Sequence, residues 1–156
     1  NPEVCDATVV LTQIVWEFSE KAEANQLEMV VECPQPPVEI YVDGRHLWRI
    51  IDNLMGNICK YAQPGTRVYI TLEKFHGMVI MTFRNISKDR LKMTSEELFG
   101  RFVRGDSSRN TEGHGLGLSI AKSLTELMHG NLAVQMDGDL FKVILSFEEY
   151  QEDKKQ

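Results

Sequence analysis

Residues 112–122 read EGHGLGLSIAK, in which every second residue from position 113 to 117 is a glycine and an apolar helical pattern follows at once. Glycine lets a backbone approach a ligand closely, and the free N–H groups at a helix start attract an anion. The glycines are Gly113, Gly115 and Gly117, and the apolar positions that anchor the predicted helix are Leu116, Ile120, Leu124 and Leu127. The pattern favours a phosphate-binding helix start. In isolation it is also typical of a tight helix start packed closely on a sheet, so both interpretations stay open here.

A second signal lies in a helix predicted over residues 43–62, which ends at a Gln-Pro-Gly breaker sequence. Its core stripe is formed by Leu47, Ile51, Leu54 and Ile58. On the adjacent flank, Asn53, Asn57 and Lys60 follow one another at helical spacing, with Tyr61 at the edge. Amide oxygens can bind a Mg²⁺ that already carries phosphate oxygens, and a lysine can neutralise phosphate charge. A solvated polar flank is the alternative, but two asparagines in mid-helix are poor helix formers that need an explanation.

The rest of the chain alternates between predicted strands and helices. Strands are predicted within 4–10 and at 27–33, 38–42, 67–75, 78–83, 131–136 and 140–147, with hairpin turns at His76-Gly77 and Asp137-Gly138. Helices are predicted at 7–26, 43–62 and 116–129, with a short one near 95–102 inside an otherwise irregular stretch from 86 to 114. Antiparallel hairpins with helices on one face indicate the α/β class and a two-layer α/β sandwich. Residues 1–147 would form the domain, and 148–156 a charged, solvated tail.

Composition limits the classes of function. The 156 residues are 42% hydrophobic and 26% charged, which is ordinary for one globular domain. The net charge of −6 argues against nucleic acid as a partner, because binding its phosphates needs a concentrated basic surface. No apolar run approaches the roughly 20 residues of a membrane-spanning helix. Three cysteines without a CxxC pair favour reduced thiols and a cytosolic compartment. Because the sequence starts at Asn1-Pro2, we expect it to be a domain of a longer protein.

Three ordered stretches resemble the catalytic and ATP-binding domain of bacterial sensor histidine kinases. HLWRIIDNLMGNICKYA at 46–62 is similar to the N box of that family, ELFGRFVRG at 97–105 to its F box, and EGHGLGLSIAKSL at 112–124 to its G2 box. Their order and spacing match over about residues 4–147. The resemblance implies the Bergerat (GHKL) ATP-binding fold, which is a mixed sheet backed by helices with a mobile lid over the nucleotide. We expect the lid at about residues 87–112.

The resemblance also implies a role for each matching residue. For the metal it implies Asn57 as the Mg²⁺ ligand, with Asn53 supporting it one turn earlier. Lys60 would meet phosphate, and Tyr61 would lie against adenine. The lid would be anchored by Phe99 and Phe102, and its phosphate-facing cations would be Arg101 and Arg104. The glycine loop would wrap the phosphates through Gly113, His114, Gly115, Leu116, Gly117 and Leu118.

One stretch departs from the family pattern. Such domains usually carry an Asp-x-Gly-x-Gly G1 box, whose Asp accepts a hydrogen bond from the adenine amino group, whereas residues 85–89 here read NISKD. Asn85 keeps an acceptor oxygen without the charge, and a charge-assisted hydrogen bond is roughly twice as strong as a neutral one. An asparagine at a strand end is also a common turn residue, so both interpretations stay open. We expect adenine binding to be weaker or to use another geometry.

The activity that the resemblance implies is a protein histidine kinase of two-component signalling, with ATP and Mg²⁺ as cofactors. The γ-phosphate would go to a histidine on the dimerisation helices of the same protein, and a response regulator would be a further partner. The parent would be a homodimer anchored in a membrane outside this cytoplasmic segment. None of the histidines fits the acceptor role: His46, His76, His114 and His129.

Two alternatives to the kinase differ in what they need from the sequence. Hydrolytic relatives such as type II topoisomerases usually carry a Glu one turn before the Mg²⁺-binding Asn, where it activates water. Asn53 occupies that position here, so we expect no hydrolytic activity. A nucleotide-silent interaction module that keeps the fold is the other alternative, and the incomplete G1 box is the feature that favours it.

Overall fold

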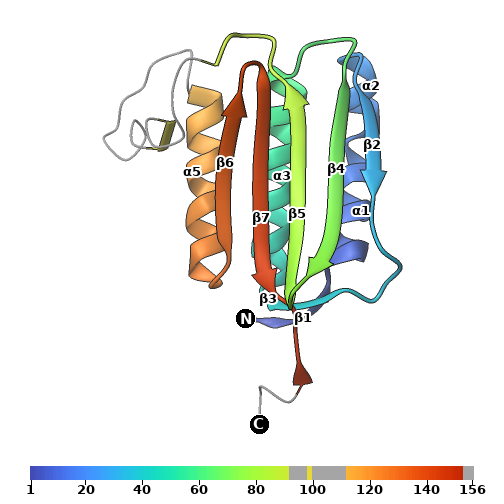
Figure 1. The fold of residues 1–156 in the computed structure, drawn as a ribbon, viewed down its shortest axis with the longest axis vertical. Helices are drawn as coiled ribbons and strands as arrows, with labels where there is room; N and C mark the ends of the chain where they lie inside the picture. The colour runs from blue at the N-terminus through green and yellow to red at the C-terminus, as the bar shows by residue number, and fades with distance from the viewer. Residues whose placement is uncertain (92–97, 100–111, 153–156) are drawn as a thin grey trace.

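The computed structural model describes residues 1–91, 98–99 and 112–152, with the backbone alone for residues 112–116. In these ranges the chain forms a sheet layer and a helix layer (Figure 1). The helices are α1 (Ala7–Glu17), α2 (Ser19–Ala24), α3 (Gly44–Tyr61) and α5 (Glu112–Leu127). The strands are β1 (Glu3–Asp6), β2 (Glu28–Glu32), β3 (Glu39–Val42), β4 (Arg67–Phe75), β5 (Met78–Ile86), β6 (Asn131–Asp137) and β7 (Leu140–Glu148). The predicted α/β sandwich is confirmed.

The main sheet has the strand order β2-β4-β5-β7-β6. β2 runs parallel to β4, and the other neighbours are antiparallel, so the sheet is mixed as expected. β1 and β3 pair in a separate two-stranded sheet. The tight turn between β4 and β5 holds His76 at φ 50° and Gly77 at φ 77°. Two consecutive positive φ angles match the right-handed twist of the flanking strands, which explains why this hairpin closes where the sequence predicts it.

The core lies between the sheet and the helices. Alternate residues of each strand point to opposite faces, and in β5 the buried row facing the helices is Val79, Met81, Phe83 and Asn85. β7 supplies a matching row, in which Phe141 lies directly opposite Asn85 in the ladder. Helix α3 lies behind the middle of the sheet, flanked by α1 and α5 (Figure 1). Asn85 is therefore a polar residue in an otherwise apolar row.

Helix α3 begins at a strong cap. The Asp43 side chain accepts hydrogen bonds from the backbone N–H groups of Arg45 at 2.9 Å and His46 at 3.3 Å. The N-terminal ammonium group, 2.8 Å from the Asp43 carboxylate, is the main reason why the pKa of Asp43 is lowered to about 2, and the two backbone bonds add to it. This cap fixes where the helix starts and therefore which residues of α3 face the core.

Several predicted boundaries need correction. The helix predicted at 7–26 is divided at Phe18, whose N–H bonds back to Val15 at 3.0 Å and ends α1. β5 continues to Ile86 because it stays paired with β7 to its end. Helix α5 spans Glu112–Leu127 and not 116–129, so the three glycines lie inside its first turns.

The end of the domain is also defined by backbone hydrogen bonds. The N–H of Glu149 donates to Gly77 and that of Tyr150 to Glu39, both at 2.8 Å. These contacts hold the first residues of the predicted tail against the two sheets, whereas residues 153–156 lie outside the described part of the chain. In that described part, no helix is long and apolar enough to cross a membrane.

Candidate functional site

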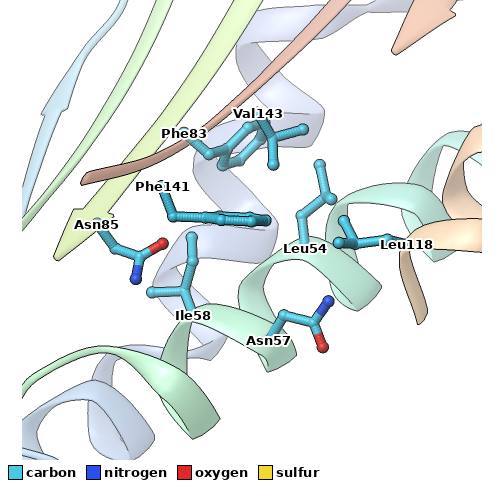
Figure 2. Close-up of a pocket in the computed structure, with 8 residues that line it drawn as sticks. All are labelled: Leu54, Asn57, Ile58, Phe83, Asn85, Leu118, Phe141 and Val143. Carbon is cyan, nitrogen blue, oxygen red and sulfur yellow. The ribbon is translucent and has the colours of Figure 1, made fainter. Parts of the chain in front are cut away.

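A cavity opens between α3, α5 and the ends of β5 and β7 that lie beside the C-terminal half of α3 (Figure 2). Its enclosed part has room for about one water molecule, about 10 Å³, and the rest of the roughly 300 Å³ of empty space includes open solvent. Its lining residues are Leu54, Asn57, Ile58, Phe83, Asn85, Leu118, Phe141 and Val143. Six of these eight are apolar, and the two amides are the polar groups. A cavity of mainly apolar walls with a few placed polar groups is typical of a small-molecule site.

Asn57 brings the two sequence motifs together. A Cβ atom at Gly117 would lie 3.5 Å from both the nitrogen and the oxygen of the Asn57 amide, so the third glycine of α5 lies directly against this side chain. The Nδ2 atom of Asn57 is buried and has no hydrogen-bond partner among the described residues. Leaving such a group unpaired costs about 1–3 kcal/mol. An unpaired buried amide needs an explanation, and a ligand that reaches Asn57 would supply one.

Asn53 and Ser119 share this feature. The Nδ2 atom of Asn53 and the Oγ atom of Ser119 are buried without a partner in the described part of the chain. Asn53 lies one turn before Asn57 on α3, and Ser119 lies on α5, which packs against α3. Ser119 was not predicted from the sequence, because a serine after an apolar motif carries no distinguishing signal. The unpaired groups thus gather on the two helices that carry the motifs.

Lys60 and Tyr61 lie at the end of α3. The Lys60 side chain is exposed, with its Nζ atom 5.4 Å from the centre of the Tyr61 ring. The carbonyl of Tyr61 accepts a hydrogen bond of 3.0 Å from the N–H of Lys88. The end of α3 is therefore tied to the segment that follows β5. Neither side chain lines the cavity itself, but both residues follow Asn57 and Ile58, which do, on the same helix.

Residues 85–89, which replace the expected G1 box, are fixed by backbone hydrogen bonds. Ser87 forms a bridge with Ala62, and its N–H donates to Asp139 at 2.8 Å. The carbonyl of Ile86 accepts from Gln63 at 2.7 Å. The non-glycine residues with positive φ that the structure describes are Gln26, His76 and His129. Since none of them lies in 85–89, this segment adopts its path without glycine.

The predicted lid anchors are described in part. Phe99 is half-buried against the core, with the Lys122 Nζ atom 5.2 Å from the centre of its ring. Lys122 also lies 3.2 Å from the carboxylate of Glu126. Arg101, Phe102 and Arg104 lie outside the described residues. The backbone of α5 includes Gly113, His114, Gly115 and Leu116, of which only the backbone is described. Leu118 is buried and lines the cavity.

Sequence reasoning missed most of the apolar wall. Phe83, Phe141, Val143 and Leu54 line the cavity but read as ordinary core residues in the sequence. The signal that could have found Phe141 is its register. Once β5 and β7 are paired, Phe141 is the cross-strand neighbour of Asn85, and directly opposed side chains on one face are in contact range.

Residues 42–151 match the family described as histidine kinase-, DNA gyrase B-, and HSP90-like ATPase. The chain belongs to this family. The sensor histidine kinase RppB of Synechocystis sp. is 31% identical over 147 residues, which are 91% of this chain and 32% of the relative. The probable sensor protein PcoS of Escherichia coli is 39% identical over 107 residues, 66% of this chain and 23% of the relative. The chain thus spans about a third or less of the length of these two relatives.

Solved structures agree with this family membership. The catalytic domain of histidine kinase ThkA superposes with a TM-score of 0.80 at 18% identity, over 96% of this chain and 96% of that one. Acinetobacter baumannii histidine kinase AdeS gives a TM-score of 0.76 at 18% identity, over 97% of this chain and 68% of the other. The mixed sheet backed by helices is therefore the fold of histidine kinase catalytic domains, which confirms the fold that the sequence motifs imply.

Proposed function

We propose that this chain is the MgATP-binding catalytic domain of a sensor histidine kinase, and that it presents the γ-phosphate to a histidine on a separate dimerisation segment. The observation that carries the proposal is the unpaired, buried amide of Asn57 against Gly117, at the mouth of a mainly apolar cavity. A hydrophobic base, an anionic chain and a metal would meet complementary groups there. The family membership of the chain supports the same assignment.

We place the base of the nucleotide at the apolar end of the cavity. Phe83, Phe141 and Val143 form the sheet side of this space, and the Asn85 amide lies at its edge (Figure 2). A planar base would be covered by apolar groups on its faces and would meet one polar group at its rim. Tyr61 at the margin would extend the apolar contact. The phosphates would then run toward α5, where Gly117 leaves room beside Asn57.

Mg²⁺ suits the residues that are present. It prefers oxygen ligands and is usually bound through one or two protein groups together with substrate phosphates and water. The described residues contain no cluster of three His, Cys, Asp or Glu side chains that could hold a metal by themselves, so a site completed by phosphate oxygens is the consistent choice. Asn57 would provide the protein oxygen, with Asn53 behind it. The metal would neutralise charge on the transferred phosphoryl group.

The protein's contribution to the reaction is placement and charge neutralisation. Lys60 is exposed at the end of α3 and carries a cation that can reach a phosphate at the margin of the cavity. Asn53 has an amide where a hydrolytic enzyme needs a base, and an amide cannot accept a proton from water at neutral pH. We therefore expect no activation of water by residue 53. The γ-phosphate would be held in line for a histidine supplied from another segment.

The partners follow from the proposed reaction. A histidine-bearing dimerisation segment would supply the acceptor, and a response regulator would receive the phosphoryl group from it. One solved neighbour, with a TM-score of 0.76, is histidine kinase ThkA in complex with response regulator protein TrrA. We propose the corresponding assembly for the full protein, as a homodimer with this domain in the cytoplasm and a membrane anchor elsewhere.

Substitution of Asn57 tests the proposal most directly. Because its Nδ2 atom has no partner in the described protein, Asn57→Ala removes no hydrogen bond from it, and alanine is the better helix former by about 0.7 kcal/mol. We expect the apo melting temperature to stay close to that of the wild type and MgATP affinity in isothermal titration to fall severely. The exposed Asn131 provides a matched control, and Asn131→Ala should leave affinity unchanged. Equal MgATP affinity in Asn57→Ala and wild type would remove the metal assignment.

Phosphotransfer needs its own experiment. The chain alone, incubated with radiolabelled MgATP, should produce neither phosphohistidine nor free phosphate at a useful rate. Fusing a histidine-bearing dimerisation segment to the chain should restore acid-labile phosphorylation. Binding without transfer even after this fusion would contradict the phosphotransfer part of the proposal. No binding at all would favour a nucleotide-silent module, for which the incomplete G1 box is the supporting feature.

A further inference from the structure

The side chain of Asn85 has a local environment that leaves its orientation open. It is only 4% exposed, yet no hydrogen bond to its amide is found among the residues that the structure describes. Figure 2 shows the amide at the rim of the cavity, with Ile58 and Phe141 beside it. Asn85 also borders a second hollow at the end of the sheet, with about 540 Å³ of empty space including solvent, lined by Arg67, Tyr69, Arg84, Asn85, Ile86 and Leu140. No hydrogen-bond partner among the described residues fixes which way the amide points.

The chemistry of an amide gives this freedom a consequence. An asparagine offers one acceptor oxygen and one NH₂ donor group, whereas an ionised aspartate can only accept hydrogen bonds. Turning the amide over exchanges the two groups at almost the same place. A base that presents an amino group would meet the oxygen, and a base that presents a carbonyl would meet the NH₂ group. Apart from Asn57, the other described residues that line the cavity are apolar, so they impose no choice between the two.

We infer that Asn85 lets this site accept purine triphosphates with either an amino or a carbonyl group at position 6. The inference rests on the proposed nucleotide-binding function and names the range of its substrates. The amide makes one neutral hydrogen bond in each orientation, and such bonds differ little in net strength. The affinities for the two classes of base should therefore lie within about tenfold of each other, which corresponds to 1.4 kcal/mol.

The probes vary the group at position 6 and, with it, the adjacent N1 atom, which accepts a hydrogen bond in adenine and carries a proton in hypoxanthine. ATP carries an amino group there, and inosine triphosphate carries a carbonyl group without the additional 2-amino group of guanine. Purine riboside triphosphate carries neither. With wild-type protein and Mg²⁺, isothermal titration should give dissociation constants for ATP and inosine triphosphate within about tenfold, and weaker binding of purine riboside triphosphate.

Asn85→Asp provides the matched variant, because it keeps the size of the side chain and removes the donor. It should tighten ATP binding relative to inosine triphosphate binding, because the 6-carbonyl loses its donor and two facing acceptors repel. The control Asn131→Ala should change neither ratio.

The outcomes separate the two proposals. Binding of ATP with inosine triphosphate weaker by more than about tenfold in the wild type would overturn the inference and leave the proposed function intact. Equal changes for both nucleotides in Asn85→Asp would also overturn it, because Asn85 would then not contact the base. Absence of binding for every nucleotide would refute the proposed function itself. The wild-type comparison decides the inference even if the variant does not fold.

Discussion

Replacing Gly117 with alanine should separate the stability of the domain from its affinity for nucleotide. Gly117 lies inside α5, where glycine is less favourable than alanine by about 1 kcal/mol. The added Cβ would lie 3.5 Å from the nitrogen and oxygen of the Asn57 amide, which is ordinary van der Waals contact. No neighbouring atom has to move. We therefore expect Gly117→Ala to stabilise the protein, raising its melting temperature by about 2–4 °C for a chain of this size.

Nucleotide affinity should change in the opposite direction. Mg²⁺ must come within about 2.1 Å of its oxygen ligands and brings its own shell of water and phosphate oxygens. A methyl group 3.5 Å from the Asn57 oxygen takes the space on that side of the amide. The metal and its oxygens would have to approach from the remaining directions. We expect MgATP affinity to fall by at least about tenfold, equivalent to 1.4 kcal/mol.

Thermal melts of the apo protein and isothermal titration with MgATP measure the two effects on the same samples. Ser123→Ala is the control, because Ser123 lies on the exposed face of the same helix. It should stabilise the protein through helix propensity by a few tenths of a kcal/mol, with unchanged affinity. If Gly117→Ala bound MgATP as tightly as the wild type, the side of Asn57 that faces α5 would not be the ligand side, and the geometry of the proposed site would be wrong.

Two further predictions concern the frame around the site. A Cβ at Gly130 would lie 2.5 Å from the Phe147 ring and 2.8 Å from a backbone carbonyl oxygen. Gly130→Ala should therefore destabilise the fold by about 1–3 kcal/mol through overpacking. An unchanged midpoint of urea unfolding would contradict this. The pKa of Asp43 is lowered to about 2 from 3.8, mainly by the N-terminal ammonium group, so the stability it contributes is present above about pH 4 and is lost as the pH falls toward 2. Asp43→Asn keeps an acceptor for the helix cap and should show a smaller loss of stability between pH 4 and pH 2 in urea titrations. Identical pH profiles would show that the charge of Asp43 is not coupled to folding.

Local sequence patterns determine how far the fold could be predicted. The two hairpins were found because their turns carry residues that adopt positive φ, and the alternation of β5 and β7 shows which side chains face inward. The parallel pairing of β2 with β4 joins one strand that precedes α3 in the sequence to one that follows it. Such long-range pairing leaves no periodic signal in either strand. Glycine is a poor helix former, which is why the start of α5 was expected four residues later than the structure places it.

The sequence likewise predicts some residues of the candidate site and not others. Asn53 and Asn57 stand out because mid-helix asparagines conflict with local helix propensity. Such conflicts are expected at functional or strained sites. The aromatic residues that line the cavity show no conflict with local propensity. Phe83 and Phe141 satisfy the strand pattern whether they pack against protein or against a ligand, so only their position beside Asn57 in three dimensions identifies them as cavity residues.

The missing glycines of the G1 box have a different meaning once the backbone is known. In the sequence, residues 85–89 look like an eroded nucleotide motif. In the structure, Ser87 is bridged to Ala62 and bonded to Asp139, and the segment needs no positive φ. A glycine would increase the conformational entropy of the unfolded chain without being required by the fold. The substitution that bears on function is therefore the loss of the charge at Asn85, which leaves a neutral amide at the rim of an apolar cavity. Under the proposed function, loss of that charge would alter which bases the cavity can hold. It does not remove the cavity, the unpaired Nδ2 atom of Asn57 or the space beside Gly117 on which nucleotide binding would depend.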